Sequence, residues 1–158
     1  MDVYCSAMRI ALYQPEIAGN VGAILRTATC FGVAVDIIEP CGFPFSQRGL
    51  RRAGMDYADH ADITRHANWD AYRAASANAG RLVLLTTRGA QPLPDFSFRA
   101  SDHLLFGNES SGVPPAIHAA ADAHVVIPLR SGFRSLNVSV AAGIALAEAL
   151  RQTKGFAP

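Results

Sequence analysis

The hydrophobic positions of this chain fall into short apolar runs separated by stretches with helical spacing. The apolar runs cover residues 9–13, 33–38, 81–86, 103–106 and 124–127. Short continuous apolar runs are typical of strands that a parallel sheet buries on both faces. Helical spacing is found over residues 20–31, 68–79, 114–121 and 137–154. The alternation of strands and helices predicts one α/β domain with a parallel sheet.

Polar and glycine residues set the expected ends of these elements. Asn20 is expected to cap the first helix, and Gly32 to end it. Proline in the first turn fits a helix over residues 114–121. Residues 46–54 are expected to form a short helix or turn, and residues 91–98, with two prolines, a loop.

The last expected helix, residues 137–154, is apolar around most of its circumference. Such a helix is covered on more than one side. One interpretation is a core helix behind the sheet. The other is that one face meets the sheet while a second face, lined with small residues such as Ala142 and Ala145, meets another subunit.

Three polar loops, residues 86–89, 107–112 and 128–136, each follow the carboxyl end of an expected strand. Open parallel sheets bind ligands at that edge. The second loop has the G-x-x-x-x-G spacing of a phosphate loop, but Val113 and Pro114 stand where lysine and serine or threonine would follow. The chain also lacks a G-x-G-x-x-G after its first strand. Loops rich in backbone donors with apolar flanks suit an adenosine moiety.

Several motifs resemble those of one enzyme family. FGNESSGVP (residues 106–114), IPLRSGFRSLNVSVAAGIALAEAL (127–150) and QPEIAGNVGAILRTATCFG (14–32) are similar to the three motifs of the SPOUT methyltransferases. IIEPCGFPF (37–45), RGLRRAGMDY (48–57) and LLTTRG (84–89) are similar to the TrmL-type tRNA wobble-nucleotide ribose methyltransferases within that family. The resemblance covers residues 8–150, with the motifs in family order and spacing. Val140 and Ala147 depart from it, since related chains often carry asparagine and an aromatic residue there.

The resemblance implies an α/β/α SPOUT fold with a C-terminal trefoil knot. It implies S-adenosylmethionine as cofactor, and 2′-O-methylation of the ribose of nucleotide 34 of tRNA, a cytidine or a modified uridine. A cytoplasmic homodimer is the expected form. The alternatives are methylation of another tRNA site or of rRNA, and a relative that binds RNA without catalysis.

The resemblance also assigns residues to roles. The expected cofactor-binding residues are Leu85, Thr86, Gly107, Ile127, Leu129, Ser135 and Leu136. The expected catalytic residues are Arg26, Ser135 and Asn137, and the expected substrate-binding residues are Asn20, Arg48, Arg51, Arg52, Glu109 and Arg134. A guanidinium is essentially never deprotonated in a protein, so Arg26 is expected to hold a phosphate and the nucleophile rather than act as a base. A solvated charged face is the other interpretation of the three arginines near residue 50.

Composition limits these interpretations. The chain has 158 residues, half of them hydrophobic, and a net charge of +1, so RNA binding has to rest on local arginines. Residues 1–7 precede the resemblance and are interpreted as a tail. The three cysteines show no C-x-x-C spacing, which favours reduced thiols in the cytoplasm, and the five histidines lack a metal-binding spacing. For that reason no metal is expected as a partner. No apolar run approaches the roughly 20 residues of a membrane span, so no membrane is expected as a partner either.

Overall fold

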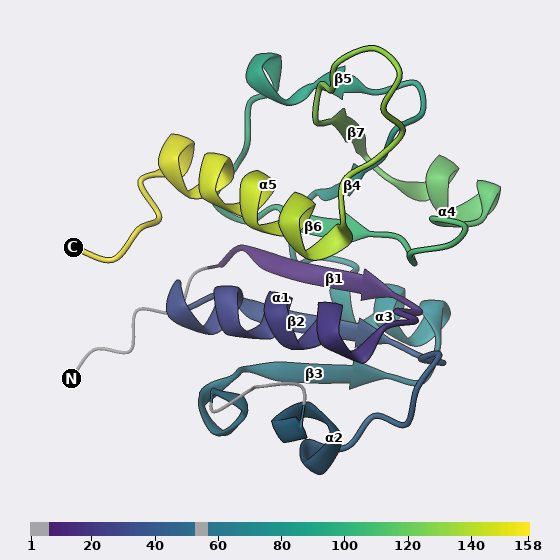
Figure 1. Cartoon of the computed structure of the whole chain (residues 1–158). Helices are drawn as coiled ribbons and strands as arrows, with labels where there is room; N and C mark the ends of the chain where they lie inside the picture. Colours follow the sequence, from purple (N-terminus) through teal and green to yellow (C-terminus); the bar gives the residue numbers. More distant parts are fainter. Residues whose placement is uncertain (1–6, 53–56) are drawn as a thin grey trace.

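A computed structural model describes residues 7–52 and 57–158, so most of the expected tail at residues 1–7 lies outside the described residues. In the described part, seven parallel strands form one sheet in the order β3-β2-β1-β6-β4-β7-β5 (Figure 1). The strands are β1 (Arg9–Tyr13), β2 (Ala34–Ile38), β3 (Ile63–His66), β4 (Leu82–Leu85), β5 (Gln91–Pro92), β6 (His103–Phe106) and β7 (Ala123–Val126). The predicted parallel α/β fold is confirmed.

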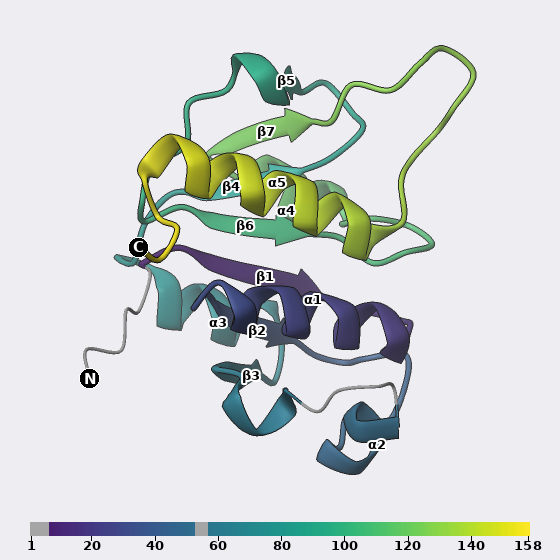
Figure 2. The same cartoon turned by 60° about the vertical axis from the view of Figure 1, so that its left-hand side comes forward.

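Helices cover both faces of the sheet. They are α1 (Ala18–Cys30), α2 (Gln47–Arg52), α3 (Trp69–Ser76), α4 (Pro115–Ala120) and α5 (Val138–Thr153), with short 3-10 turns at Ala58–His60 and Leu93–Asp95. Figures 1 and 2 show α1 and α5 on one face, and α3 and α4 on the other. Among the described residues, no helix is both long enough and apolar enough to cross a membrane.

The central strands are apolar at most positions because each face packs against helices. Ile10 and Leu12 belong to the cluster under α1 and α5, whereas Ala11 and Tyr13 belong to the cluster under α3 and α4. All four side chains are buried. This two-sided burial explains the continuous apolar runs in the sequence.

Two strands were not predicted because they lie at the edges of the sheet. The pattern of residues 63–66 is polar, since the middle two side chains of β3 are exposed. Residues 91–98 were predicted as a loop, but Gln91–Pro92 pairs with β7 as the edge strand β5. Proline is tolerated at an edge because its missing N–H breaks no ladder bond there. Of the expected turn at residues 46–54, α2 accounts for Gln47–Arg52, and the last two residues lie outside the described part.

The small residues of α5 face the core rather than a second subunit. Ala142 and Ala145 are 2% and 0% exposed and pack in the cluster that also contains α1 and the sheet. The expectation that they line an intersubunit face is therefore wrong. Small side chains are placed there because they let α5 approach α1 and the strands closely. The outward apolar residues of α5 are Val140 and Ile144, which are 51% and 40% exposed.

Two of the histidines stabilise the α3 side of the sheet. His66 Nε2 lies 2.7 Å from Asp36 Oδ1, and the Tyr72 hydroxyl lies 3.2 Å from His103 Nδ1. Burial lowers the pKa of His103, so its ring is neutral at pH 7. These two histidines therefore have structural roles.

A buried carboxylate fixes the turn before β6. The Asp102 side chain is fully buried and accepts hydrogen bonds from Arg81 Nε at 3.0 Å and Arg81 Nη2 at 2.7 Å. It also accepts one from the backbone N–H of Arg99 at 2.8 Å. The turn therefore depends on the buried charge of Asp102, whose cationic partner among these contacts is Arg81.

We expect Arg81→Ala to lower the free energy of unfolding by about 3 kcal/mol, because it leaves the Asp102 charge buried without its cation. Denaturant titration followed by circular dichroism measures the loss. Arg151→Ala is the control, because Arg151 pairs with Glu148 at the surface and its side chain is 68% exposed. Equal losses in the two variants would contradict this account.

Candidate functional site

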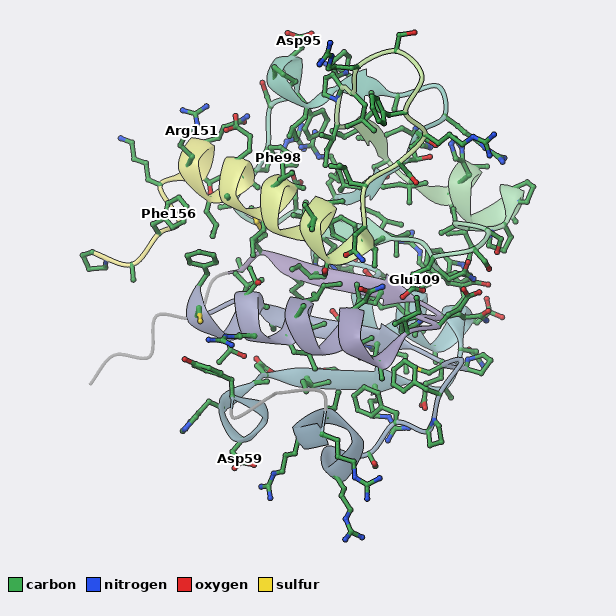
Figure 3. All side chains as sticks on the ribbon, viewed as in Figure 1. Asp59, Asp95, Phe98, Glu109, Arg151 and Phe156 are labelled. Atoms are coloured by element: carbon green, nitrogen blue, oxygen red, sulfur yellow. The ribbon has the colours of Figure 1, made fainter. Side chains whose placement is uncertain are left out.

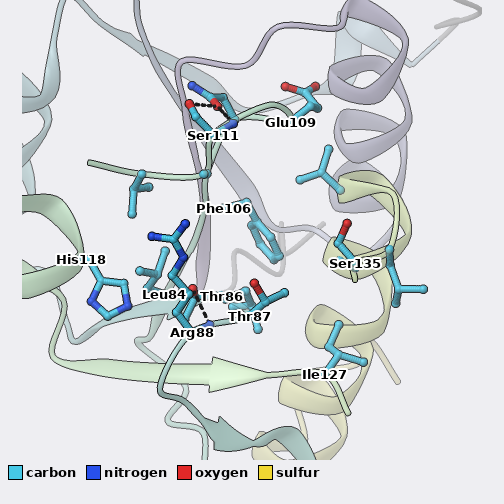
Figure 4. Close-up of a pocket in the computed structure, with 18 of the residues that line it drawn as sticks. Leu84, Thr86, Thr87, Arg88, Phe106, Glu109, Ser111, His118, Ile127 and Ser135 are labelled. Carbon is cyan, nitrogen blue, oxygen red and sulfur yellow. Dashed lines mark hydrogen bonds between the residues drawn. The ribbon is translucent and has the colours of Figure 1, made fainter. Parts of the chain in front are cut away.

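A cavity of about 1110 Å³ opens at the carboxyl edge of the sheet, where the loops after β4, β6 and β7 meet (Figure 4). The strand order makes this possible, since β4 lies directly between β6 and β7. The cavity is lined by every predicted cofactor-binding residue, namely Leu85, Thr86, Gly107, Ile127, Leu129, Ser135 and Leu136. Asn20, Glu109, Arg134 and Asn137 line it as well.

The cavity walls combine apolar strand ends with polar loops. Leu84, Phe106 and Ile127 come from the ends of three neighbouring strands, and Figure 4 shows their side chains around the same space as Thr87 and Ser135. Thr86 Oγ1 accepts a hydrogen bond from a backbone N–H two residues later and so shapes the first loop. Such a site encloses a flat apolar group and offers polar atoms around it.

The loop after β6 is a tight hairpin formed around two glycines. Asn108 and Gly112 exchange backbone hydrogen bonds of 3.0 Å. A Cβ atom on Gly107 would lie 2.4 Å from the carbonyl carbon of Gly112, and Gly112 itself has a φ of +68°. The Asn108 side chain closes the turn by accepting from the Ser111 N–H and hydroxyl, each at 2.9 Å. Glycine is therefore required at position 107 because the loop backbone leaves no room for a side chain.

Hydrogen bonds join residues from all three motifs at one end of the cavity. Asn20 Nδ2 donates to Glu109 Oε1 at 3.1 Å, and Asn137 Nδ2 donates to Asn20 Oδ1 at 3.0 Å. The Glu109 carboxylate also accepts from the backbone N–H of Glu16 at 2.8 Å and of Ile17 at 3.2 Å. One carboxylate and two amides therefore hold the starts of α1 and α5 against the loop after β6.

The prediction that Asn20 caps the first helix is wrong. Helix α1 begins at Ala18 with Ile17 in the capping position, so Asn20 lies inside the first turn. Its side chain is 9% exposed and points into the hydrogen-bond network instead. The sequence does not distinguish a capping asparagine from one inside the first turn, because an asparagine side chain near a helix start can form hydrogen bonds in either position.

Asn137 is the N-cap of α5. Its side chain accepts hydrogen bonds from the Ser139 N–H at 2.9 Å and the Ser139 hydroxyl at 2.6 Å. The start of α5 borders the cavity, which Asn137, Val138 and Ala141 line. Ser135, just before this helix, borders the same space.

Four predicted arginines lie outside the cavity of their own chain. Arg26 is exposed on α1, with its guanidinium 5.0 Å from the centre of the Tyr57 ring. Arg48, Arg51 and Arg52 are exposed on α2. Arg51 pairs with Asp59 at 2.9 Å, and Figure 3 shows Asp59 beyond β3, away from Glu109 and the cavity loops.

His118 lines the cavity, a role that its sequence context did not indicate. Its Nε2 is buried and has no hydrogen-bond partner among the described residues. Its ring stacks on His124 with centroids 4.2 Å apart, and His124 Nε2 lies 2.6 Å from the His118 carbonyl oxygen. Within residues 7–52 and 57–158, no group of acidic, histidine or cysteine side chains is arranged to hold a metal ion.

The sequence matches known proteins over nearly its whole length. The model of the SpoU rRNA Methylase family matches residues 7–147. A protein of Beijerinckia indica named tRNA (cytidine(34)-2′-O)-methyltransferase is 56% identical over 149 residues, which cover 94% of this chain and 93% of that protein. A protein of Escherichia coli K12 with the same name is 40% identical over 147 residues, covering 92% and 93%.

Solved structures agree in fold. One, concerning the 2-OH methylation of C/U34 on tRNA, superposes with a TM-score of 0.88 at 40% identity and covers 94% of this chain and 97% of that one. An AdoMet-bound rRNA methyltransferase from Sinorhizobium meliloti superposes with a TM-score of 0.82 at 31% identity, covering 91% of this chain but 56% of that one.

We expect Gly107→Ala to lower the free energy of unfolding by about 1–3 kcal/mol, because the new methyl group would force the backbone of the loop after β6 apart. Gly19→Ala is the control, since no atom lies within 4 Å of its added Cβ and alanine favours a helix. Denaturant titration of both variants makes the comparison. If Gly107→Ala has the same free energy of unfolding as the natural chain, the loop after β6 can open to admit the methyl group without loss of stability.

Proposed function

The chain belongs to the SpoU methylase family, and we propose that it transfers a methyl group from S-adenosylmethionine to the ribose 2′-hydroxyl of nucleotide 34 of tRNA. Two observations together carry this proposal. Relatives and a solved structure that match more than nine-tenths of the chain concern methylation at this nucleotide. The cavity collects every cofactor-binding residue that the motifs predicted. The match over residues 7–147 confirms the family predicted from the sequence.

The cavity fits the cofactor in size and chemistry. Pockets for small molecules usually measure about 300–1,000 Å³, so a cavity of about 1110 Å³ has room for the cofactor and for part of a nucleotide. The apolar ends of Leu85 and Ile127 suit the faces of an adenine ring, while the hairpin after Gly107 is held closed by its own backbone hydrogen bonds. When bound, S-adenosylmethionine supplies an electrophilic methyl group.

We assign the lining residues roles by position. Leu85, Thr86, Gly107, Ile127, Leu129, Ser135 and Leu136 hold the cofactor. Ser135 and Asn137 shape the reacting end, because they precede α5 at the point where Asn20 and Glu109 converge. Holding the nucleotide in line with the methyl group provides much of the rate, since alignment converts a bimolecular step into a unimolecular one.

We propose that Arg26 acts on the cavity of a second copy of the chain. It does not line its own cavity, and it is exposed on α1. The same side of the molecule carries an exposed apolar surface, formed by Ile17 at the start of α1 and by Val140 and Ile144 on α5. This surface, called the α1/α5 surface below, adjoins the cavity through Asn137. A homodimer across it would bring one α1 to the other cavity, where Arg26 would hold a phosphate and the attacking hydroxyl.

The remaining contacts belong to the RNA substrate. Arg134 lines the cavity mouth, and Asn20 and Glu109 hold the loops on which the nucleotide rests. Arg48, Arg52 and the partly neutralised Arg51 are exposed on α2, where they would neutralise phosphates further along the tRNA. A cytoplasmic location follows from tRNA as the substrate.

We infer that the C-terminal chain is knotted. β7 pairs between β4 and the edge strand β5, but the chain then runs back so that α5 packs against α1 and β6 near the middle of the sheet. Such a return past the loops of β4 and β6 is what the family resemblance leads us to expect. Methylation of rRNA is less favoured, because relatives that are 56% and 40% identical to this chain are named for nucleotide 34 of tRNA.

We expect the purified chain to methylate tRNA at the 2′-hydroxyl of nucleotide 34, and Arg26→Ala to lower the single-turnover rate about 10²–10³-fold while leaving cofactor affinity unchanged. Arg26→Lys should restore little, because an ammonium lacks the planar fork. Mass spectrometry of nucleosides and cofactor calorimetry are the measurements. Methylation at another nucleotide would overturn the substrate assignment, and near-normal turnover of Arg26→Ala would remove this residue from the mechanism.

We expect a homodimer in solution, and we expect Ile144→Glu to dissociate it, because the new charge would be buried in the α1/α5 surface. Light scattering at micromolar concentration measures the mass. Ala116→Glu, at an exposed position of α4 on the other face of the sheet, should leave the mass unchanged. A monomeric natural chain would refute the dimer.

A further inference from the structure

The loop between β7 and α5 carries the most exposed large apolar side chain described. Phe133 is 73% exposed, ahead of Val140 and Ile17 at 51% each. Figure 2 shows this loop projecting from the body of the molecule between β7 and α5. Single exposed apolar residues are common, but Leu129 and Leu136 of the same loop are also 37% exposed. The loop therefore presents an apolar tip to solvent at the mouth of the cavity.

The backbone holds Phe133 in this exposed position. Its N–H donates to the Arg130 carbonyl oxygen at 3.3 Å, which closes a turn. Gly132 has a φ of +93°, which glycine adopts without strain. Because Arg134 and Ser135 directly follow and line the cavity, the turn ties the position of the ring to that of the site.

The charges around Phe133 favour a nucleic acid as its partner. Arg130 and Arg134 flank it and are exposed, and in the described part of the chain neither forms an ion pair. An exposed aromatic ring with unpaired guanidinium groups nearby in the sequence suits single-stranded RNA, whose bases stack on aromatic rings while its phosphates bind cations. The overall charge of +1 makes this local concentration distinctive.

We propose that Phe133 stacks on an unpaired base next to the nucleotide whose ribose enters the cavity, with Arg130 and Arg134 holding the adjoining phosphates. The proposal rests on the proposed function, since it takes RNA as the substrate. A ribose held at Ser135 carries its neighbouring nucleotides past the mouth of the cavity, where the loop projects. Phe133 is thus a substrate contact that selects for an unstacked base and has no part in the methyl transfer itself.

The test compares Phe133→Ala and Phe133→Trp with the natural chain, using an RNA stem-loop in which 2-aminopurine replaces one loop base beside the target. Stacking on an aromatic residue contributes about 1–3 kcal/mol per base, so Phe133→Ala should weaken RNA binding about 5- to 150-fold. It should raise KM for RNA, leave kcat at saturating RNA unchanged and abolish the change in 2-aminopurine fluorescence. Phe133→Trp should keep both affinity and fluorescence change.

The matched control is Phe156→Ala, which removes another exposed phenylalanine, 41% exposed and in contact with Phe31 away from the cavity. It should leave RNA affinity unchanged. If the natural chain methylates tRNA and Phe133→Ala binds RNA as tightly as the natural chain does, the stacking role is overturned and the proposed function stays intact. Weakened S-adenosylmethionine binding, or a lower mass in solution, would overturn it in favour of a cofactor cover or a subunit contact. A natural chain that binds the cofactor but no RNA would overturn both proposals.

Discussion

The carboxylate of Glu109 is the contact on which the site depends. It lies on the loop after β6, yet it accepts hydrogen bonds from the backbone just before α1 and from Asn20 within α1, and Asn20 in turn binds Asn137 at the start of α5. Residues about ninety positions apart are joined by the first of these links, and residues more than a hundred apart by the last. Because hydrogen bonds to an ionised group are stronger than neutral ones, this small network stabilises a junction that the hydrophobic core alone would leave mobile.

The sheet positions the elements that meet at that junction. Because its strands are mostly apolar, the sheet could be predicted from the sequence. Arg9–Tyr13 was predicted with its observed bounds, because burial on both faces leaves the four positions after Arg9 apolar. The edge strand Ile63–His66 could not be recognised, since its exposed middle residues remove the pattern. The face of α5 was assigned wrongly for a related reason. Alanine at positions 142 and 145 fits a close contact with any partner, and only the packing shows that the partner is this chain's own core.

The site residues divide in the same way. Those that follow strand ends, such as Gly107 and Ile127, were placed by the motifs and lie together in the cavity. Positions that depend on how helices pack were harder to predict from the sequence. Asn20 lies inside its helix instead of capping it, and no periodic pattern indicated that His118 of α4 lines the cavity. The arginines on α1 and α2 face outward, so their role depends on molecules that meet the surface rather than on the fold of one chain.

The strand order also constrains how the chain is made. β1, β2 and β3 are neighbours in both sequence and sheet, so the first three strands can pair as they leave the ribosome. β4 cannot do the same, because its two partners, β6 and β7, follow it in the sequence by about twenty and forty residues. Until they are synthesised, the segment LVLL keeps both edges unpaired, which exposes it to aggregation and to chaperones. A translational pause soon after β4 would prolong this exposure, whereas one after β7 would allow the sheet to close.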